Sequence, residues 1–190
     1  MKKLLLIPAL LLFTSPMFAD TVLEDQATAC ISEMGSNASG LESCLSKLFV
    51  PASMDCDELL QVHRTIIKAA EGRNNATVRT VSRVSAKLAI VSLAANCYSP
   101  DVAARLVART GSEASGGSSI VADGIVSGAV DAASSLGVDS GSLANSASSG
   151  TSSGDGSSSG ESGGRNTARV DGVEIYYDNE VNVSPSNTDG

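Results

Sequence analysis

The sequence predicts a mainly α protein: a small, disulfide-stapled helical bundle of four to five helices, followed by a disordered Ser/Gly-rich tail with a short C-terminal β segment. Apolar residues recur at helical spacing through much of residues 20–110. All four cysteines lie in this part of the chain. Ser and Gly supply 21 of the 31 residues from 134 to 164, so this stretch has little apolar surface to bury.

The N-terminal stretch MKKLLLIPALLLFTSPMFA, residues 1–19, has the features of a secretory signal peptide. Two lysines precede an apolar run that extends from Leu4 to Phe13, and Ala19 precedes the expected cut. A transmembrane anchor is the alternative, but spanning a bilayer takes roughly 20 apolar residues. We therefore expect a bacterial protein that is exported to the periplasm or beyond the cell.

Charge divides the mature chain into two unlike parts. Removal of residues 1–19 leaves 11 basic and 21 acidic side chains, a net charge of −10. Residues 20–110 are about neutral, with nine basic and ten acidic side chains, whereas residues 111–190 hold two basic and eleven acidic ones. The acidic part should repel nucleic acid and anionic membranes, so we expect no nucleic-acid partner.

Residues 20–48 are predicted to form a helical hairpin. Apolar residues follow helical spacing on both sides of the break GSNASG. Cys30 and Cys44 each lie seven residues from Asn37, so antiparallel helices would bring them face to face. In an oxidising compartment this arrangement favours a disulfide.

A second helical hairpin is predicted between Cys56 and Cys97. Asp55 can cap the first helix, and the second runs through ATVRTVSRVSAKLAIVSLAANC. The two cysteines lie about equally far from the turn, which favours a second disulfide between them. The alternative pairing joins Cys30 to Cys97 and Cys44 to Cys56, which would tie the first hairpin onto the second.

A short fifth helix follows, with Ser99 as cap and Pro100 at its first position. Residues 111–133 are predicted to form a weak Ala/Gly-rich helix, in which Gly124, Gly128 and Ala132 lie four apart. Such a row allows close approach of helices in membranes. The simpler interpretation is a helix that docks on the core, because the apolar run is short and contains two aspartates.

Residues 134–169 are predicted to form a flexible linker, and residues 170–190 a β-prone acidic tail. In the tail, Val173, Ile175 and Tyr177 alternate with polar residues, which indicates a strand. The segment DNE can turn this strand into a hairpin with Val181 and Val183. We expect Val173, Ile175 and Tyr177 to bind a protein partner by strand addition; the alternative is a disordered, solubilising end.

The sequence offers no recognisable catalytic, cofactor-binding or metal site, and no cofactor is expected. His63 is the only histidine, and its spacing among leucines and isoleucines indicates a half-buried structural residue. The four cysteines lack CxxC spacing, so neither a redox pair nor a zinc site is indicated.

A basic stripe, Arg79, Arg83 and Lys87, lies at four-residue spacing on the predicted fourth helix. It is either an ordinary solvated face or a strip that binds an acidic partner. Together these features predict a non-enzymatic binding or assembly protein of the cell envelope or the extracellular space. An enzyme with a site hidden from sequence remains the alternative, with a membrane-active factor using residues 118–133 a more distant one.

Overall fold

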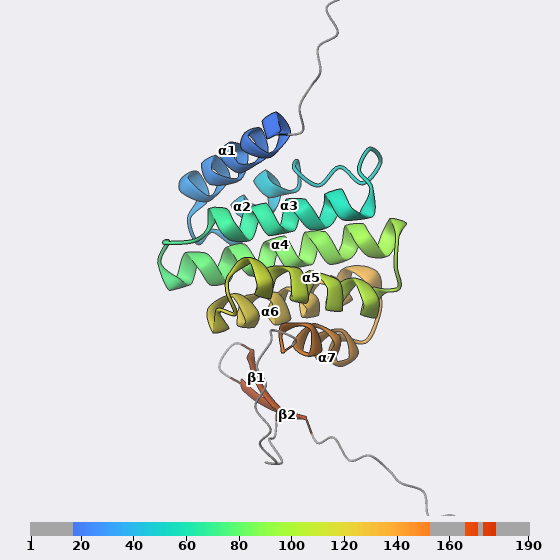
Figure 1. Ribbon diagram of the computed structural model, residues 1–190. Coiled ribbons are helices and arrows are strands. Elements are labelled where there is room, and N and C mark those ends of the chain that lie inside the picture. Colours follow the sequence, from blue (N-terminus) through green and yellow to red (C-terminus); the bar gives the residue numbers. More distant parts are fainter. Residues whose placement is uncertain (1–16, 153–165, 171–172, 178–190) are drawn as a thin grey trace, which may run out of the picture.

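The computed structural model describes residues 17–152, 166–170 and 173–177, and its side chains are described for residues 21–152. Within these ranges the chain forms seven helices and one two-stranded sheet (Figure 1). The predicted all-helical domain is confirmed, but the predicted count of four to five helices is too low. The elements are α1 (Met17–Met34), α2 (Ala38–Leu45), α3 (Cys56–Ala69), α4 (Asn75–Asn96), α5 (Pro100–Ala114), α6 (Ser119–Leu136), α7 (Ser140–Thr151), β1 (Asn166–Val170) and β2 (Val173–Tyr177).

The first hairpin forms as predicted and is closed by a disulfide. The Asn37 side chain caps α2 by accepting a hydrogen bond from the Gly40 backbone N–H at 3.2 Å. Cys30 and Cys44 form a disulfide with their Cα atoms 5.8 Å apart. Ile31, Leu41 and Leu45, with almost no exposed surface, anchor this hairpin in the core.

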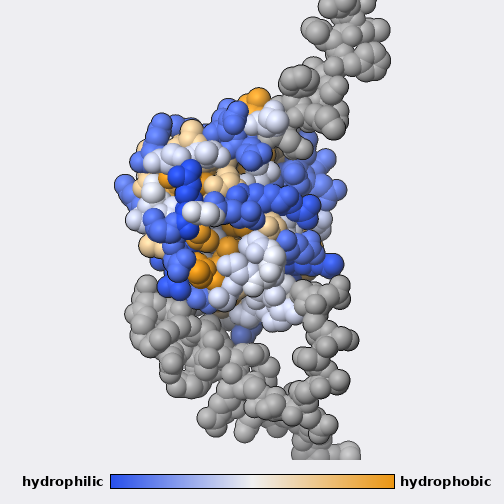
Figure 2. Space-filling view, turned by 60° about the vertical axis from the view of Figure 1, so that its left-hand side comes forward, coloured by the Kyte–Doolittle hydropathy of each residue, from blue (hydrophilic) through white to orange (hydrophobic). Residues whose placement is uncertain are grey.

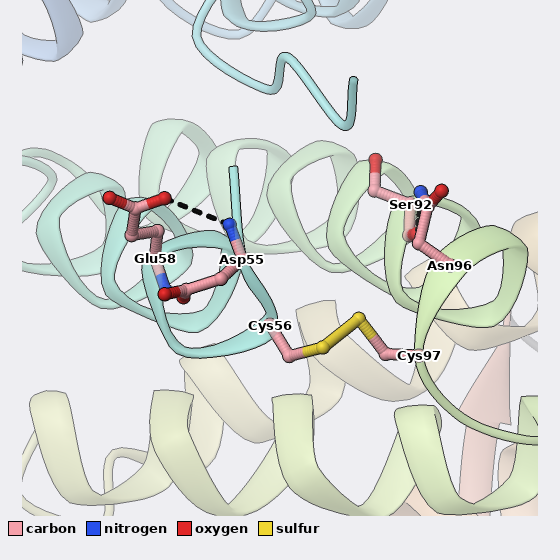
Figure 3. Close-up of a disulfide and its surroundings, with 6 residues drawn as sticks. All are labelled: Asp55, Cys56, Glu58, Ser92, Asn96 and Cys97. Carbon is pink, nitrogen blue, oxygen red and sulfur yellow. Dashed lines mark hydrogen bonds between the residues drawn. A yellow bond between two sulfur atoms is a disulfide. The ribbon is translucent and has the colours of Figure 1, made fainter. Parts of the chain in front are cut away.

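The second hairpin, α3 and α4, is closed by the Cys56–Cys97 disulfide, whose Cα atoms lie 6.1 Å apart. Figure 3 shows this bridge beside the capping box that starts α3. There the Asp55 carboxylate accepts from the Glu58 N–H, and the Glu58 carboxylate accepts from the Asp55 N–H, both at 2.8 Å. Both predicted disulfide pairs are therefore confirmed.

Helix α4 is the central helix and contacts α2, α3, α5 and α6 (Figure 1). Its contact with α6 depends on the small residues of α6. A Cβ atom at Gly124 would lie 2.7 Å from the carbonyl oxygen of Arg79, and one at Gly128 would lie 2.9 Å from the Cβ of Ala86. Glycine at these two positions lets the backbones of α4 and α6 approach more closely than any larger residue would allow.

Helix α7 lies within residues 134–169, for which the sequence predicts a flexible linker, and that prediction is wrong over residues 140–151. Leu143, Ala144, Ala147 and Gly150 share one face of the helix and are buried. This face packs against α5 and α6. The packed helical part of the chain therefore runs from α1 to α7 instead of ending near residue 110.

The core consists mainly of aliphatic side chains and alanines from all seven helices. On the face shown in Figure 2, hydrophilic residues surround a small group of apolar ones. Among the described side chains, the exposed large hydrophobic ones come from separate segments of the chain: Val22, Val50, Tyr98 and Val138.

Candidate partner-binding surfaces

His63 lies on α3 and is completely buried, where the sequence suggested half-burial. Its Nδ1 atom lies 2.8 Å from the hydroxyl of Ser85 on α4. Within the described part of the chain, its Nε2 atom has no hydrogen-bond partner. A Cβ atom at Gly111 on α5 would lie 2.9 Å from Nε2, so the glycine makes room for the ring.

Burial lowers the pKa of His63 from 6.5 to about 4, and a smaller effect of the Val107 backbone opposes this shift. The imidazole is therefore neutral at pH 7. Because no part of the side chain reaches solvent, a dissolved substrate has no contact with it. His63 acts as a core residue that joins α3 to α4.

The basic stripe faces carboxylates of the same chain. Arg83 donates two hydrogen bonds to Asp131 of α6, at 2.7 and 3.0 Å. Arg79 pairs with Asp123 of α6 at 3.2 Å, and Lys87 pairs with Glu42 of α2 at 2.7 Å. The aspartates of α6 thus match the spacing of the arginines of α4. Binding of an outside partner by Arg79, Arg83 and Lys87 would have to compete with these ion pairs.

Helix α6 is long and apolar enough, by length and composition alone, to cross a membrane, whereas the sequence pattern predicts an apolar run too short to span one. Core helices of soluble proteins can pass the same test. In this fold the row of Gly124, Gly128 and Ala132 is buried, and the two glycines contact α4. Membrane insertion of α6 would expose its partner face on α4.

A strand, β2, spans Val173–Tyr177, the segment whose alternation predicts one. It pairs with β1 in antiparallel register, with Ala168 opposite Ile175 and Val170 opposite Val173. The partner strand therefore precedes β2 in the sequence, whereas Val181 and Val183, the partners predicted from the sequence, lie outside the described residues. Asp171–Gly172, a favoured dipeptide of tight hairpins, stands between the strands and was the signal for this pairing.

Within the described residues, no cluster of three or more His, Cys, Asp and Glu side chains has the geometry of a metal site. All four cysteines are consumed in disulfides. The partner-binding roles predicted for Val173, Ile175 and Tyr177 remain predictions, since the structure describes only their backbone. Comparison of the chain with protein-family models, with curated proteins and with solved structures finds no match to any of them.

Proposed function

We propose that this protein is an exported, non-enzymatic binding or assembly protein, in which a disulfide-stapled helical domain carries a C-terminal segment that pairs with a protein partner. The observation that carries the proposal is the two-stranded β1–β2 hairpin, which follows the helical domain in the sequence. Its sheet has two strands within the described residues, so each strand has one neighbour and one unpaired edge. Unpaired edges expose backbone N–H and C=O groups that can accept a further strand.

The energetics of a two-stranded sheet support the same function. A single hairpin is at best marginally stable in water, because it buries little apolar surface. A third strand from a partner would add a ladder of hydrogen bonds along one edge and place its side chains beside those of the neighbouring strand. The tail acids Asp171, Glu174, Asp178 and Glu180 would oppose pairing between copies of this chain, since like charges would then lie close together.

The helical domain supports a binding role better than catalysis. The histidine is sealed in the core, and each member of the basic stripe already faces a carboxylate. Two disulfides and a close-packed core suit a stable carrier for a binding segment. An enzyme remains the alternative, and it predicts turnover of a substrate that does not depend on the hairpin.

The test is capture of a partner from envelope extract or culture supernatant of the source cells. The bait is the full chain, compared with the double variant Ile175→Ser/Tyr177→Ser. We expect the double variant to lose the captured protein, while the melting temperature of the helical domain stays the same. Tyr176→Ser is the matched control, because residue 176 alternates with residues 175 and 177 along the strand.

Two results would contradict the proposal. If the double variant captured the same protein as the natural chain, strand addition by β2 would be excluded. If Tyr176→Ser abolished capture as completely as the double change, the contact would not have the alternation of a strand. A chain that captured nothing in any form would favour a solubilising role for the tail.

A further inference from the structure

A shallow groove of about 250 Å³ lies between α5 and the end of α7. One side is formed by residues of a single face of α5, at positions 102, 105, 106 and 109, and the other by Ser149 and Gly150 of α7. A Cβ atom at Gly150 would lie 2.5 Å from the Arg105 carbonyl oxygen, so the two helices are in close contact at the floor. The groove is therefore an open surface feature with a rigid base.

The groove carries an excess of positive charge. Arg105 has no hydrogen-bond or ion-pair partner within the described part of the chain. Arg109 pairs with Glu113 at 2.8 Å, and Arg64 of α3 reaches the same carboxylate at 3.5 Å. Two guanidinium groups thus share the Glu113 carboxylate, and the Arg105 guanidinium is paired with no carboxylate in the described residues. The arginines of the basic stripe, in contrast, each face a separate aspartate.

Apolar surface lies beside these charges, since Val102 and Leu106 are only partly buried and line the same groove. A complementary ligand needs carboxylates and aliphatic side chains a few ångströms apart. A large polyanion would meet the net charge of −10 of the mature chain and be repelled at longer range. A short acidic peptide fits the surface better than nucleic acid does.

We propose that this groove binds residues 178–183 of the same chain, the sequence Asp-Asn-Glu-Val-Asn-Val. Asp178 and Glu180 pair with Arg105 and Arg109, and the two valines of the segment cover Val102 and Leu106. This is an intramolecular site that holds the segment following β2 against the helical domain. It goes beyond the proposed function and does not depend on it, because strand addition involves residues 173–177.

The small binding free energy expected for this groove favours an occupant from the same chain. An exposed ion pair contributes about 0.2–1 kcal/mol, so two such pairs with some apolar burial give only weak binding. A flexible connection provides an effective concentration on the order of millimolar, which suffices for a weak contact. Residues 178–183 follow directly on β2, and its partner strand β1 contacts α6 of the helical domain.

The test is a zero-length cross-link in the full-length protein. Arg105→Lys keeps the charge and introduces an amine that a carbodiimide can couple to a carboxylate in direct contact. Peptide mass mapping should show the new lysine joined to Asp178 or Glu180 within monomeric protein. The link should disappear in the triple variant Arg105→Lys/Asp178→Asn/Glu180→Gln.

Arg79→Lys is the matched control, because Arg79 pairs with Asp123 at 3.2 Å and both side chains are exposed. Its new lysine should couple to Asp123, which shows that the reaction detects a real ion pair. If this control reacts while the lysine at position 105 couples only to domain carboxylates or to none, the proposal is overturned. A link to the tail found only in cross-linked dimers would also overturn it, since the occupant would then be a second copy.

Discussion

Single buried or paired residues account for much of how this domain holds together. His63 and Ser85 connect α3 with α4 through one hydrogen bond in the centre of the core, at 2.8 Å. Asp101 at the start of α5 accepts hydrogen bonds from Ser142 and Ser146 of α7, at 3.0 and 3.1 Å. The hydroxyl groups that make α7 look like a linker in the sequence therefore bind it to α5.

Stability should depend on pH through His63. Its pKa is about 4 in the folded protein and 6.5 in the unfolded chain, so the unfolded state takes up a proton first as the pH falls. The contribution is fully present above about pH 6.5 and decreases as the pH drops toward 4. A difference of this size corresponds to about 3 kcal/mol in the free energy of unfolding.

We expect the free energy of unfolding of His63→Gln to lack the pH-dependent contribution of the imidazole, although the substitution itself lowers stability. Urea unfolding at several pH values between 4 and 7 measures the free energy of unfolding of both proteins. Carboxylates titrate in both proteins, so their contribution cancels in the difference between the two free energies of unfolding. That difference should shrink as the pH falls, because only the natural chain loses the contribution of the neutral imidazole. A difference that is constant over this range would show that the buried imidazole is not what makes folding pH-dependent.

Helix packing depends on glycines at close contacts. Gly128 of α6 lies against Arg83 and Ala86 of α4, and Gly150 of α7 lies against Arg105 and Ala108 of α5. In a core almost without aromatic residues, such contacts replace large interlocking side chains. Small residues on α6 and α7 let these helices pack closely against α4 and α5.

Gly128→Ala should destabilise the protein by about 1–3 kcal/mol, since the new methyl group overlaps the α4 backbone. Helix propensity alone predicts the reverse, a gain of about 1 kcal/mol. Gly141→Ala is the control, because a Cβ there meets only Asp139 Oδ1, at 3.3 Å. Denaturant midpoints of the two variants distinguish these effects. Equal stabilisation by both changes would show that Gly128 is not in a tight contact.

The disulfide between α3 and α4 should matter to stability. It closes a segment with a sequence separation of 41 residues, for which chain entropy predicts a contribution of about 4 kcal/mol. Cys97→Ser should lower the melting temperature by far more than a surface change such as Lys68→Ser. It should also leave Cys56 as a thiol that alkylating reagents modify. An unchanged melting temperature would mean that packing alone holds the hairpin.

At the scale of the whole molecule, the boundary between the neutral and the acidic part of the chain differs from the boundary of the packed helical domain. Residues 111–190 supply −9 of the net charge of −10, yet two acids of that part, Asp123 and Asp131, neutralise arginines of α4. The division into a neutral and an acidic half therefore does not coincide with the division into helical domain and tail. Helices α6 and α7 belong to the acidic half of the sequence and to the packed helical domain.

Limited proteolysis tests this layout. Unpacked backbone is where proteases cut first, and the composition of residues 153–165 predicts initial cleavage there. The resistant fragment should extend through α7 to about Thr151. A fragment ending near residue 134 would show that α7 is not part of the stable domain. Intact mass of the exported protein also locates the mature N-terminus, which we expect at Asp20.

Local features of the sequence determined the two helical hairpins and their disulfides. The cap residues Asp55 and Ser99 precede α3 and α5, Cys30 and Cys44 are symmetric about their turn, and Cys56 and Cys97 lie at the outer ends of α3 and α4. The strand at 173–177 was equally readable from its alternation. These predictions held because each depends on neighbours in sequence, where spacing and turn residues carry the information.

Only the tertiary structure decided the roles of α7, the basic stripe and His63. Leu143, Ala147 and Gly150 are too few and too small to predict a helix among so many serines. They become helical because α5 and α6 provide a surface that they fit. Likewise, nothing near Arg83 in the sequence identifies Asp131 as its partner. Arg83 and Asp131 are 48 residues apart, and the energy of such a contact exists only once the helices have packed.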